Sequence, residues 1–397
     1  PTILWLGAKA VNNLTGLELI PAMMLLGGLS LAYSLYGGLK AVALTDVIQV
    51  VLLIFGGLFV TYKGLDLLSE GNGLFEGFMI LQSEFPEKFD AILSYAPKEV
   101  DPEAYANYIK LPGIWVLIGG MWIAHFYYWG TNQYITQRAL GGKSLDEAQN
   151  GLMFAGFLKI FMPIVVVLPG LIAVALEANG TINLAGDRSN AYPSMLNLLP
   201  EGIKGLTFAA LVAAIVSSLA SLSNSVSTIF TMDIYRKDQD INDVSLVKIG
   251  RIAGFVGLVT SIIVAPIFLG SLDSAFQYVQ EYMGLFSPVI LFVFLSAIFL
   301  KNSTTRSVLE GSFVALALGV ILKLYVANNP GSAIEPFMHQ MAISFVAAFL
   351  VNYFRSPQTT NEKVFNLTRA DFNTSKLFNT GSIAILLILG GIYSFYW

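Results

Sequence analysis

Long apolar segments separated by polar loops run along the whole 397-residue chain. A helix that crosses a bilayer needs about 20 mostly apolar residues; about ten segments reach that length, and one at 1–12 reaches it in part. The complete segments are roughly 18–37, 40–65, 113–137, 150–177, 204–231, 247–270, 274–300, 306–327, 336–355 and 380–397. Strands of outer-membrane barrels alternate over about ten residues, and these continuous runs do not. The sequence therefore predicts an all-α, polytopic membrane helix bundle, with residues 1–397 forming a single transmembrane domain.

The loop charges segregate when the predicted spans alternate across the membrane. Thirteen of the 22 Lys and Arg residues then fall on one side, among them Arg138, Arg236 and Lys301. The other side holds the long loop 66–112, which is rich in Asp and Glu. Because positively charged loops stay in the cytoplasm, loop 66–112 is predicted to be external, as is Trp397. Short amphipathic helices are expected in this loop, and another in 179–203.

Composition strengthens the membrane assignment and excludes several classes of function. Hydrophobic residues make up 55% of the chain and charged residues only 12%, whereas soluble domains carry about 25% charged residues. The absence of cysteine excludes disulfides, cysteine-ligated metals and thiol catalysis within this sequence. Two histidines cannot build a typical zinc site on their own. A net charge of −4 argues against nucleic-acid binding.

No motif for nucleotide-driven or hydrolytic chemistry occurs. The chain has no phosphate-binding glycine loop followed by Lys-Ser/Thr, no Gly-x-Ser-x-Gly and no His-Glu-x-x-His. We therefore expect a protein that is not an enzyme, has no cofactor, and draws its energy from an ion gradient. The chain begins at Pro1 inside an apolar stretch without a preceding basic segment, so it is expected to be a fragment whose beginning is missing.

Polar residues within the predicted spans indicate where a solute would bind, since such groups usually face a cavity. Lys159 lies in an apolar span. One interpretation is that its side chain extends the ammonium group to the membrane interface. The other is that the ammonium donates a hydrogen bond to a substrate hydroxyl or carboxylate. Segment 113–137 carries several glycines around His125, Tyr128 and Trp129. A helix broken by glycine frees backbone groups to line a site, and aromatic faces suit a sugar ring. The alternative is a belt of aromatics at the membrane interface.

Small polar residues recur in segment 204–231. Ser217, Ser221 and Ser225 are four residues apart and share one helix face. One interpretation is a packing seam whose hydroxyls bond back to the preceding turn. The other is a site in which the Ser217 and Ser218 hydroxyls and the Ala214 carbonyl provide hard oxygen ligands for Na⁺.

Two further groups of polar residues lie near the ends of predicted spans. Asp46 is either a helix-capping carboxylate or a way-station for a cation. Gln277, Gln280 and Glu281 form a polar patch with Phe276 beside it. This patch is either interfacial or a polar contact with an aromatic lid over a site.

Several stretches resemble the sodium/solute symporter family, and most closely its bacterial sodium/sugar cotransporters of the galactose and glucose type. They are SLYGGLKAVALTDVIQV, YYWGTNQYITQRALGGKSLDEAQ, FLKIFMPIVVVLPG, AAIVSSLASLSNSVSTIFTMDIY and AFQYVQEYMGLFSP. The resemblance covers essentially the whole chain. It implies two inverted five-helix repeats with peripheral helices, which work by alternating access around sites at the membrane midplane.

The resemblance also implies roles for individual residues. Ala214, Ser217 and Ser218 match three Na⁺ ligands, and Asp46 matches an acidic residue on the Na⁺ exit route. Relatives have Asn at the position of His125, a departure that bears on which solute is bound and introduces a group that titrates near neutral pH.

The solute site is implied in the same way. Lys159 and Gln280 match sugar-contacting positions. Tyr128 matches the aromatic residue of the inner gate, with Trp129 beside it, and Phe276 matches part of the outer gate. Family members carry three further helices, and the rest of a fourth, ahead of the position of Pro1.

The leading hypothesis is Na⁺-coupled symport of a sugar or similar polyol across the cytoplasmic membrane, in a multi-pass protein whose partners are Na⁺, a small solute and the lipid bilayer. The alternatives are Na⁺ symport of an organic acid, an amino acid or inositol, and a non-transporting sensor that keeps the transporter fold. A membrane-embedded enzyme would need an acid–base pair or metal ligands at depth, for which only Lys159 and His125 are candidates.

Overall fold

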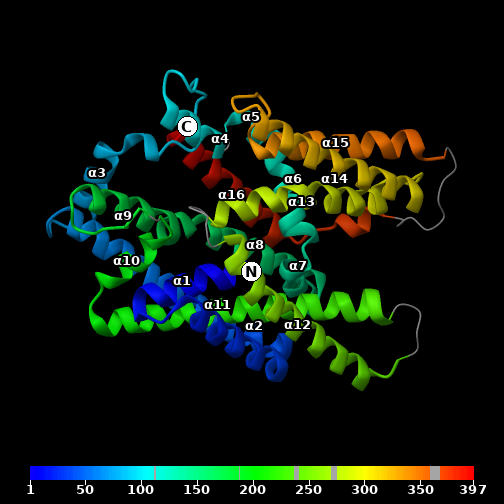
Figure 1. Ribbon diagram of the computed structural model, residues 1–397, viewed down its shortest axis with the longest axis horizontal. Coiled ribbons are helices and arrows are strands. Elements are labelled where there is room, and N and C mark those ends of the chain that lie inside the picture. Colours follow the sequence, from blue (N-terminus) through cyan, green and yellow to red (C-terminus); the bar gives the residue numbers. More distant parts are fainter. Residues whose placement is uncertain (111–112, 187, 237–240, 270–274, 358–366) are drawn as a thin grey trace. The chain divides into compact units, whose positions relative to one another are not determined.

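The computed structural model describes residues 1–110, 113–186, 188–236, 241–269, 275–357 and 367–397 (Figure 1). These residues form helices and loops, with no β-strand among them, so the all-α prediction is confirmed. In the described part of the chain, seven helices are long and apolar enough to cross a membrane, or up to ten if each bent pair of helices counts as one span.

Several of the predicted spans are bent or joined to a neighbour, for identifiable reasons. α1 (Thr2–Thr15) ends where Gly16 adopts a positive φ of 74°, and the helix that follows leaves at 117°. α2 (Leu19–Leu68) is one continuous run of helix and joins the predicted segments 18–37 and 40–65. Glycines lower the propensity of a helix without necessarily ending it, so the Gly37-Gly38 pair does not separate them.

The predicted span 150–177 is bent by 43° between α8 (Leu145–Ile160) and the helical stretch that includes α9 (Leu168–Ala178). A π-helical turn, Pro163–Val167, lies at the bend. Proline lacks the N–H that a regular helix would use there, which accounts for both the turn and the change of direction.

The first of two compact units comprises Pro1–Phe89 and Gly156–Phe276. In it α2 packs along α11 (Glu201–Ile229), with α1 and α12 (Asp243–Leu269) against both. A methyl group added at Gly56 on α2 would lie 2.6 Å from Thr207 Cγ2 on α11, so the two helices approach through small residues.

The short helices expected in loops 66–112 and 179–203 are present. α3 (Leu74–Glu84) and α10 (Ala191–Asn197) pack with α2 and α9 around one apolar core of the first unit. The buried members of that core include Val60, Leu81, Ile172 and Met195. The assignment of loop 66–112 to the outer side stays a prediction.

The second unit comprises Asp90–Ala155 and Gln277–Trp397. Its helices are α4 (Pro102–Lys110), α5 (Ile114–Ile118), α6 (Gly120–Phe126), α7 (Gln133–Leu140), the start of α8, α13 (Ala275–Phe299), α14 (Thr305–Asn328), α15 (Phe337–Arg355) and α16 (Lys376–Phe395). α14 and α15 run side by side (Figure 1). Phe292, fully buried, packs with Ala315 and Ala348 where α13, α14 and α15 meet.

The buried side-chain amide of Asn352 in this unit is hydrogen-bonded through both its nitrogen and its oxygen. Asn352, 2% exposed, donates from Nδ2 to Ser303 Oγ at 2.9 Å and accepts at Oδ1 from Ser307 Oγ at 2.7 Å. Ser307 also completes a capping box with Thr304 at the start of α14. This network ties the beginning of α14 to the end of α15 without leaving the amide unsatisfied.

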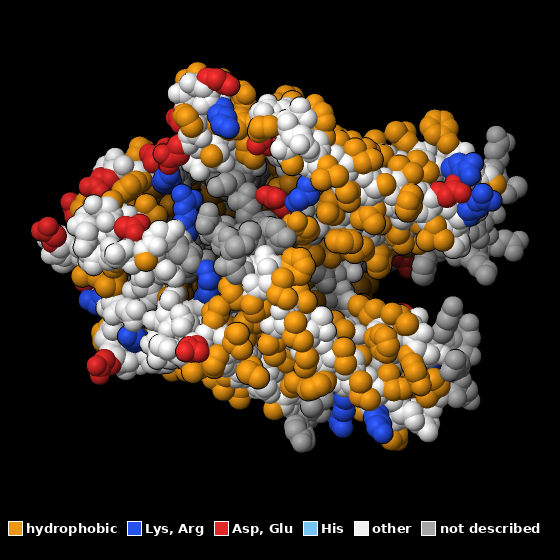
Figure 2. Space-filling view, viewed as in Figure 1, with side chains coloured by type: hydrophobic (Ala, Val, Ile, Leu, Met, Phe, Trp, Pro, Cys, Tyr) orange, Lys and Arg blue, Asp and Glu red, His pale blue; other side chains and the backbone are white. Residues whose placement is uncertain are grey.

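The helix surfaces suit lipid rather than water. α16 has no buried residue, and its exposed side chains include Leu386, Leu387 and Phe395. Figure 2 shows broad areas of hydrophobic side chains on the visible face, with few charged side chains among them. Soluble proteins rarely expose apolar areas of this extent.

Gly120→Ala is expected to lower the thermal stability of the purified full-length protein in detergent. The added methyl group would lie 2.0 Å from the Met338 carbonyl oxygen of α15, and backbone cannot turn aside as a flexible side chain would. Overpacking of this kind costs about 1–3 kcal/mol. Gly390→Ala on α16 is the control, because no atom lies within 4 Å of its added carbon. Equal melting temperatures for the two variants would contradict the close packing of α6 on α15.

Candidate functional site

A carboxylate and a hydroxyl from distant parts of the chain meet between α2 and α11 in the first unit. Ser217 Oγ on α11 donates a hydrogen bond to Asp46 Oδ1 on α2, although the residues are 171 positions apart. Ser217 is 2% exposed and Asp46 is half-buried. The sequence assigned these residues separate roles as a Na⁺ ligand and a point on the ion's exit route, and the structure brings them into contact.

The arrangement leaves oxygen atoms that suit a small hard cation. A serine hydroxyl has one proton and two lone pairs, so donating to Asp46 leaves the Ser217 oxygen able to coordinate an ion. Ser218 and Ala214 are half-buried on the same helix. Because α11 is uninterrupted at Ala214, the Ala214 carbonyl oxygen keeps its hydrogen bond within the helix. The second lone pair of this oxygen is available to a cation. The Asp46 carboxylate adds a negative charge beside the Ser217 hydroxyl.

Other polar residues around this contact were missed by sequence reasoning. Ser34 Oγ on α2 donates to Asn224 Oδ1 on α11 at 2.8 Å, and the hydroxyls of Tyr33 and Thr45 bond to each other. Asn224 Nδ2 is buried and has no hydrogen-bond partner among the described residues. Asn224 lies seven residues after Ser217, two helical turns along the same face, and that spacing could have revealed it.

The predicted aromatic gate lies on an irregular helix in the second unit. α5 ends at Ile118 and α6 begins at Gly120, with Gly119 between them at a non-helical φ of −103° and ψ of −102°. The break predicted from the glycines in this segment is therefore confirmed. A π-helical turn, Tyr127–Thr131, follows α6, and such turns are frequent at functional sites.

One aromatic residue anchors this turn and two are presented outward. Tyr127 is 9% exposed and packs with Ile123, Leu291 and Met341. Tyr128 and Trp129 are 38% and 46% exposed, with ring centroids 5.0 Å apart and planes at 86°. Rings held edge to face in this way present a stable apolar surface to a ligand. His125, one turn earlier, is exposed as well.

The remaining predicted contacts are distributed over both units. Lys159 lies near the end of α8, in the part that belongs to the first unit, and its side chain is exposed. Gln280 lies on α13 in the second unit and is also exposed. The side chain of Phe276 lies outside the described residues. The joint action of these residues on one solute stays a prediction.

Comparison with known proteins identifies the family. The model of the sodium:solute symporter family matches residues 3–319. The chain belongs to the sodium:solute symporter family. It is a transporter and not an enzyme, a multi-pass membrane protein whose coupling ion is Na⁺.

Individual relatives agree with this assignment. The symporter is 39% identical to the sodium/glucose cotransporter of Vibrio parahaemolyticus over 414 residues, covering 100% of this chain and 74% of the relative. It is 30% identical to the sodium/myo-inositol cotransporter 2 of Mus musculus, covering 80% of this chain and 49% of the relative.

A solved structure shares the fold. It is the substrate-bound outward-open state of a Na⁺-coupled sialic acid symporter, with a TM-score of 0.70 and 21% identity, covering 90% of this chain and 71% of that one. The likeness supports the fold implied by the sequence resemblance, an inverted-repeat transporter bundle with peripheral helices.

Asp46→Asn and Ser217→Ala are each expected to raise the Na⁺ concentration for half-maximal uptake about tenfold in the full-length symporter. A hydrogen bond to a charged group contributes roughly 1.5–3 kcal/mol, and about 1.4 kcal/mol corresponds to a factor of ten. The double variant should be little worse than the worse single variant, because both substitutions disrupt one contact.

Ser225→Ala is the matched control on the same helix face. Ser225 is buried and its Oγ donates to the Ser221 carbonyl at 3.1 Å within α11. Its loss should leave the Na⁺ dependence of uptake unchanged. If the effects of Asp46→Asn and Ser217→Ala simply multiply in the double variant, the two residues do not act as one site.

Proposed function

We propose that this symporter couples the inward movement of Na⁺ to the uptake of a monosaccharide or similar polyol across the cytoplasmic membrane. The observation that carries this proposal is the 39% identity to a sodium/glucose cotransporter along the entire chain. The family assignment supplies the Na⁺-coupled symport, and the choice of a sugar rests on that relative and on the residues around the aromatic turn.

Na⁺ would bind between α2 and α11, at the contact of the Asp46 carboxylate with the Ser217 hydroxyl, with Ser218 as a further ligand from α11. In the structure the half-buried Asp46 carboxylate accepts a hydrogen bond from the Ser217 hydroxyl. Bound Na⁺ would neutralise the negative charge of this carboxylate and hold α2 and α11 in one arrangement. A solute that prefers this arrangement then binds more tightly in the presence of Na⁺, and Na⁺ binds more tightly in the presence of the solute.

The solute would contact residues whose chemistry suits a hydroxylated ring. The exposed rings of Tyr128 and Trp129 offer apolar faces to the C–H face of a sugar. The Gln280 amide both donates and accepts hydrogen bonds, and the Lys159 ammonium donates up to three, which suits the hydroxylated rim.

A second candidate is another small solute carried by the same Na⁺ coupling. The similarity to a myo-inositol cotransporter favours a cyclic polyol. The other alternative is a solute that carries a carboxylate, because the Lys159 ammonium could form an ion pair with that group. His125, in place of the Asn expected from the resemblance, is the residue we would examine first for a difference in specificity.

Proteoliposomes that contain the full-length symporter are expected to accumulate a labelled hexose only under an inward Na⁺ gradient. The panel should contain D-glucose, D-galactose, myo-inositol and an organic acid, each with Na⁺ or with K⁺ outside. Vesicles without protein, and vesicles with Na⁺ equal on both sides, serve as controls. Accumulation of the acid alone would overturn the sugar assignment while leaving Na⁺ coupling in place. Binding without uptake of any solute would favour a sensor.

A further inference from the structure

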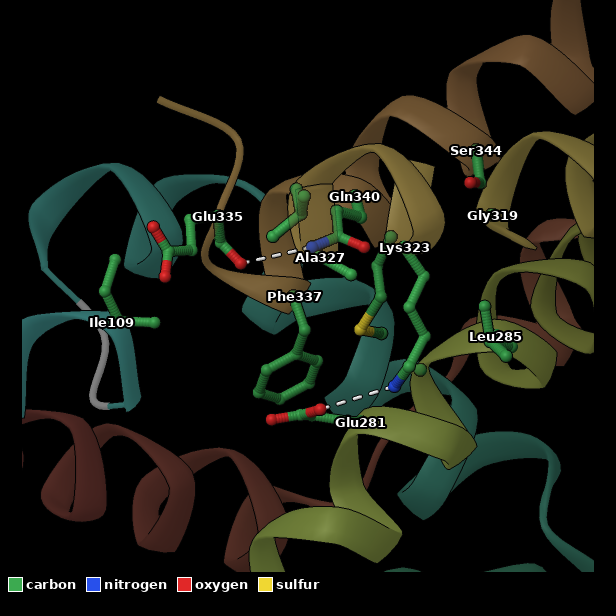
Figure 3. Close-up of a pocket in the computed structure, with 13 residues that line it drawn as sticks. Ile109, Glu281, Leu285, Gly319, Lys323, Ala327, Glu335, Phe337, Gln340 and Ser344 are labelled. Atoms are coloured by element: carbon green, nitrogen blue, oxygen red, sulfur yellow. Dashed lines mark hydrogen bonds and ion pairs between the residues drawn. The ribbon is translucent and has the colours of Figure 1, made fainter. Parts of the chain in front are cut away.

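A cavity of about 220 Å³ lies within the second unit. Of the polar patch predicted from the sequence it includes Glu281, and its lining contains none of the residues assigned by resemblance to solute or Na⁺ binding. It is lined by Ile109 of α4 and by residues of α13, α14 and α15 (Figure 3). The lining is close to the start of α13, the end of α14 and the start of α15. The charge pattern of the loops predicts that these helix ends face outward.

Charged groups hold one side of the cavity in a defined arrangement. Lys323 Nζ on α14 lies 3.3 Å from Glu281 Oε2 on α13 and 4.2 Å from the centre of the Tyr282 ring. Figure 3 shows the Lys323 and Glu281 side chains pointing toward each other. Glu335 accepts hydrogen bonds from the Tyr105 hydroxyl and the Gly331 N–H, both at 2.5 Å. Two carboxylates and one ammonium thus stand in place before any ligand arrives.

A buried hydroxyl in the lining lacks a partner. Ser344 on α15 is 2% exposed, lines the cavity, and its Oγ has no hydrogen-bond partner among the described residues. Nearby, Gln340 uses Nε2 on the carbonyls of Ile334 and Glu335, at 3.2 and 3.1 Å, which fixes the orientation of its amide. A buried polar group without a partner is uncommon in folded proteins and calls for an explanation.

Apolar groups complete the lining. Phe337 stands among the polar side chains in Figure 3, and Leu285 and Met341 also contact the cavity. An aromatic ring beside several hydrogen-bonding groups matches a molecule with one apolar C–H face and a hydroxylated edge. The volume is below the roughly 300–1,000 Å³ typical of sites for drug-sized ligands, so the ligand is small.

We propose that this cavity is a second binding site for a small polyhydroxylated solute, distinct from the site at which Na⁺-coupled transport takes place. Solute hydroxyls would donate to Glu281 and Glu335 and accept from Lys323 and Ser344. A simple anion is disfavoured because the carboxylates outnumber the ammonium, and a metal cation would have to displace Lys323 from Glu281. The choice of a polyhydroxylated ligand rests on the proposed function, whereas the cavity and its unpartnered hydroxyl do not.

The test is binding of labelled D-glucose, D-galactose and myo-inositol to purified full-length protein with Na⁺ replaced by choline. Without Na⁺ the coupled site is weakened, whereas the cavity contains none of the predicted Na⁺ ligands. Ser344→Ala is expected to weaken Na⁺-free binding of the best of these probes about three- to tenfold, the effect of losing one hydrogen bond. Melting temperatures should show that the variant folds, since the substitution removes an unpartnered buried group.

Ser296→Ala is the matched control. Ser296 on α13 is fully buried and its Oγ also lacks a partner among the described residues, but it does not line the cavity. Ser296→Ala should leave the binding unchanged. Lys323→Met, which keeps the apolar stem and removes the charge, should weaken binding as a second variant.

The outcomes separate this proposal from the transport function. Absence of Na⁺-free binding of all three probes, or equal affinity in the wild type, Ser344→Ala and Lys323→Met, overturns the second site even if Na⁺-driven sugar uptake is observed. Na⁺-free binding that is sensitive to Ser344→Ala and insensitive to Ser296→Ala supports it even if the transported solute proves to be an acid.

Discussion

A polar group inside a bilayer must find its hydrogen-bonding partners within the protein, because lipid offers none. Two contacts in the described helices follow that constraint. Asn352 is buried between α14 and α15 with each side of its amide bonded to a serine. Ser217 donates a hydrogen bond to Asp46 across α2 and α11. Among the described residues, Asn224 Nδ2 and Ser344 Oγ are buried without a protein partner, and Ser344 also lines the cavity proposed as a second solute site.

The contact between α2 and α11 links packing to ion binding. Small residues such as Gly56 bring these helices close, and the closeness allows two short side chains, Asp46 and Ser217, to reach each other. Larger residues along the seam would separate the carboxylate from the hydroxyl. An ion that binds there stabilises one spacing of the two helices, which is how a small cation could bias a conformational equilibrium.

Sequence patterns were sufficient for the parts of the structure that depend on composition and local chemistry. Continuous apolar runs predicted an all-α membrane bundle, and the glycines of segment 113–137 predicted the interruption at Gly119. Patterns were less informative where a helix continues or bends. The Gly37-Gly38 pair does not end α2, whereas Pro163 bends the helix after α8.

Pairings across long sequence separations could not be predicted from one chain. Asp46 and Ser217 were each identified as polar residues in apolar surroundings, but nothing local indicated that they touch. Ser34 and Asn224 were missed because a single hydroxyl or amide in a small-residue span looks like packing. The cavity near Ser344 depends on four helices, α4, α13, α14 and α15, and on Glu335, so no one segment of sequence reveals it.

Coupled binding of Na⁺ and solute is tested most directly by measuring each affinity with and without the other in purified full-length protein. Linkage requires that Na⁺ tighten solute binding by the same factor as the solute tightens Na⁺ binding, typically about 5- to 150-fold. We expect equal factors well above one, both reduced by Asp46→Asn and neither by Ser225→Ala. A solute affinity that is the same in Na⁺ and in choline would contradict Na⁺ coupling through the contact between α2 and α11.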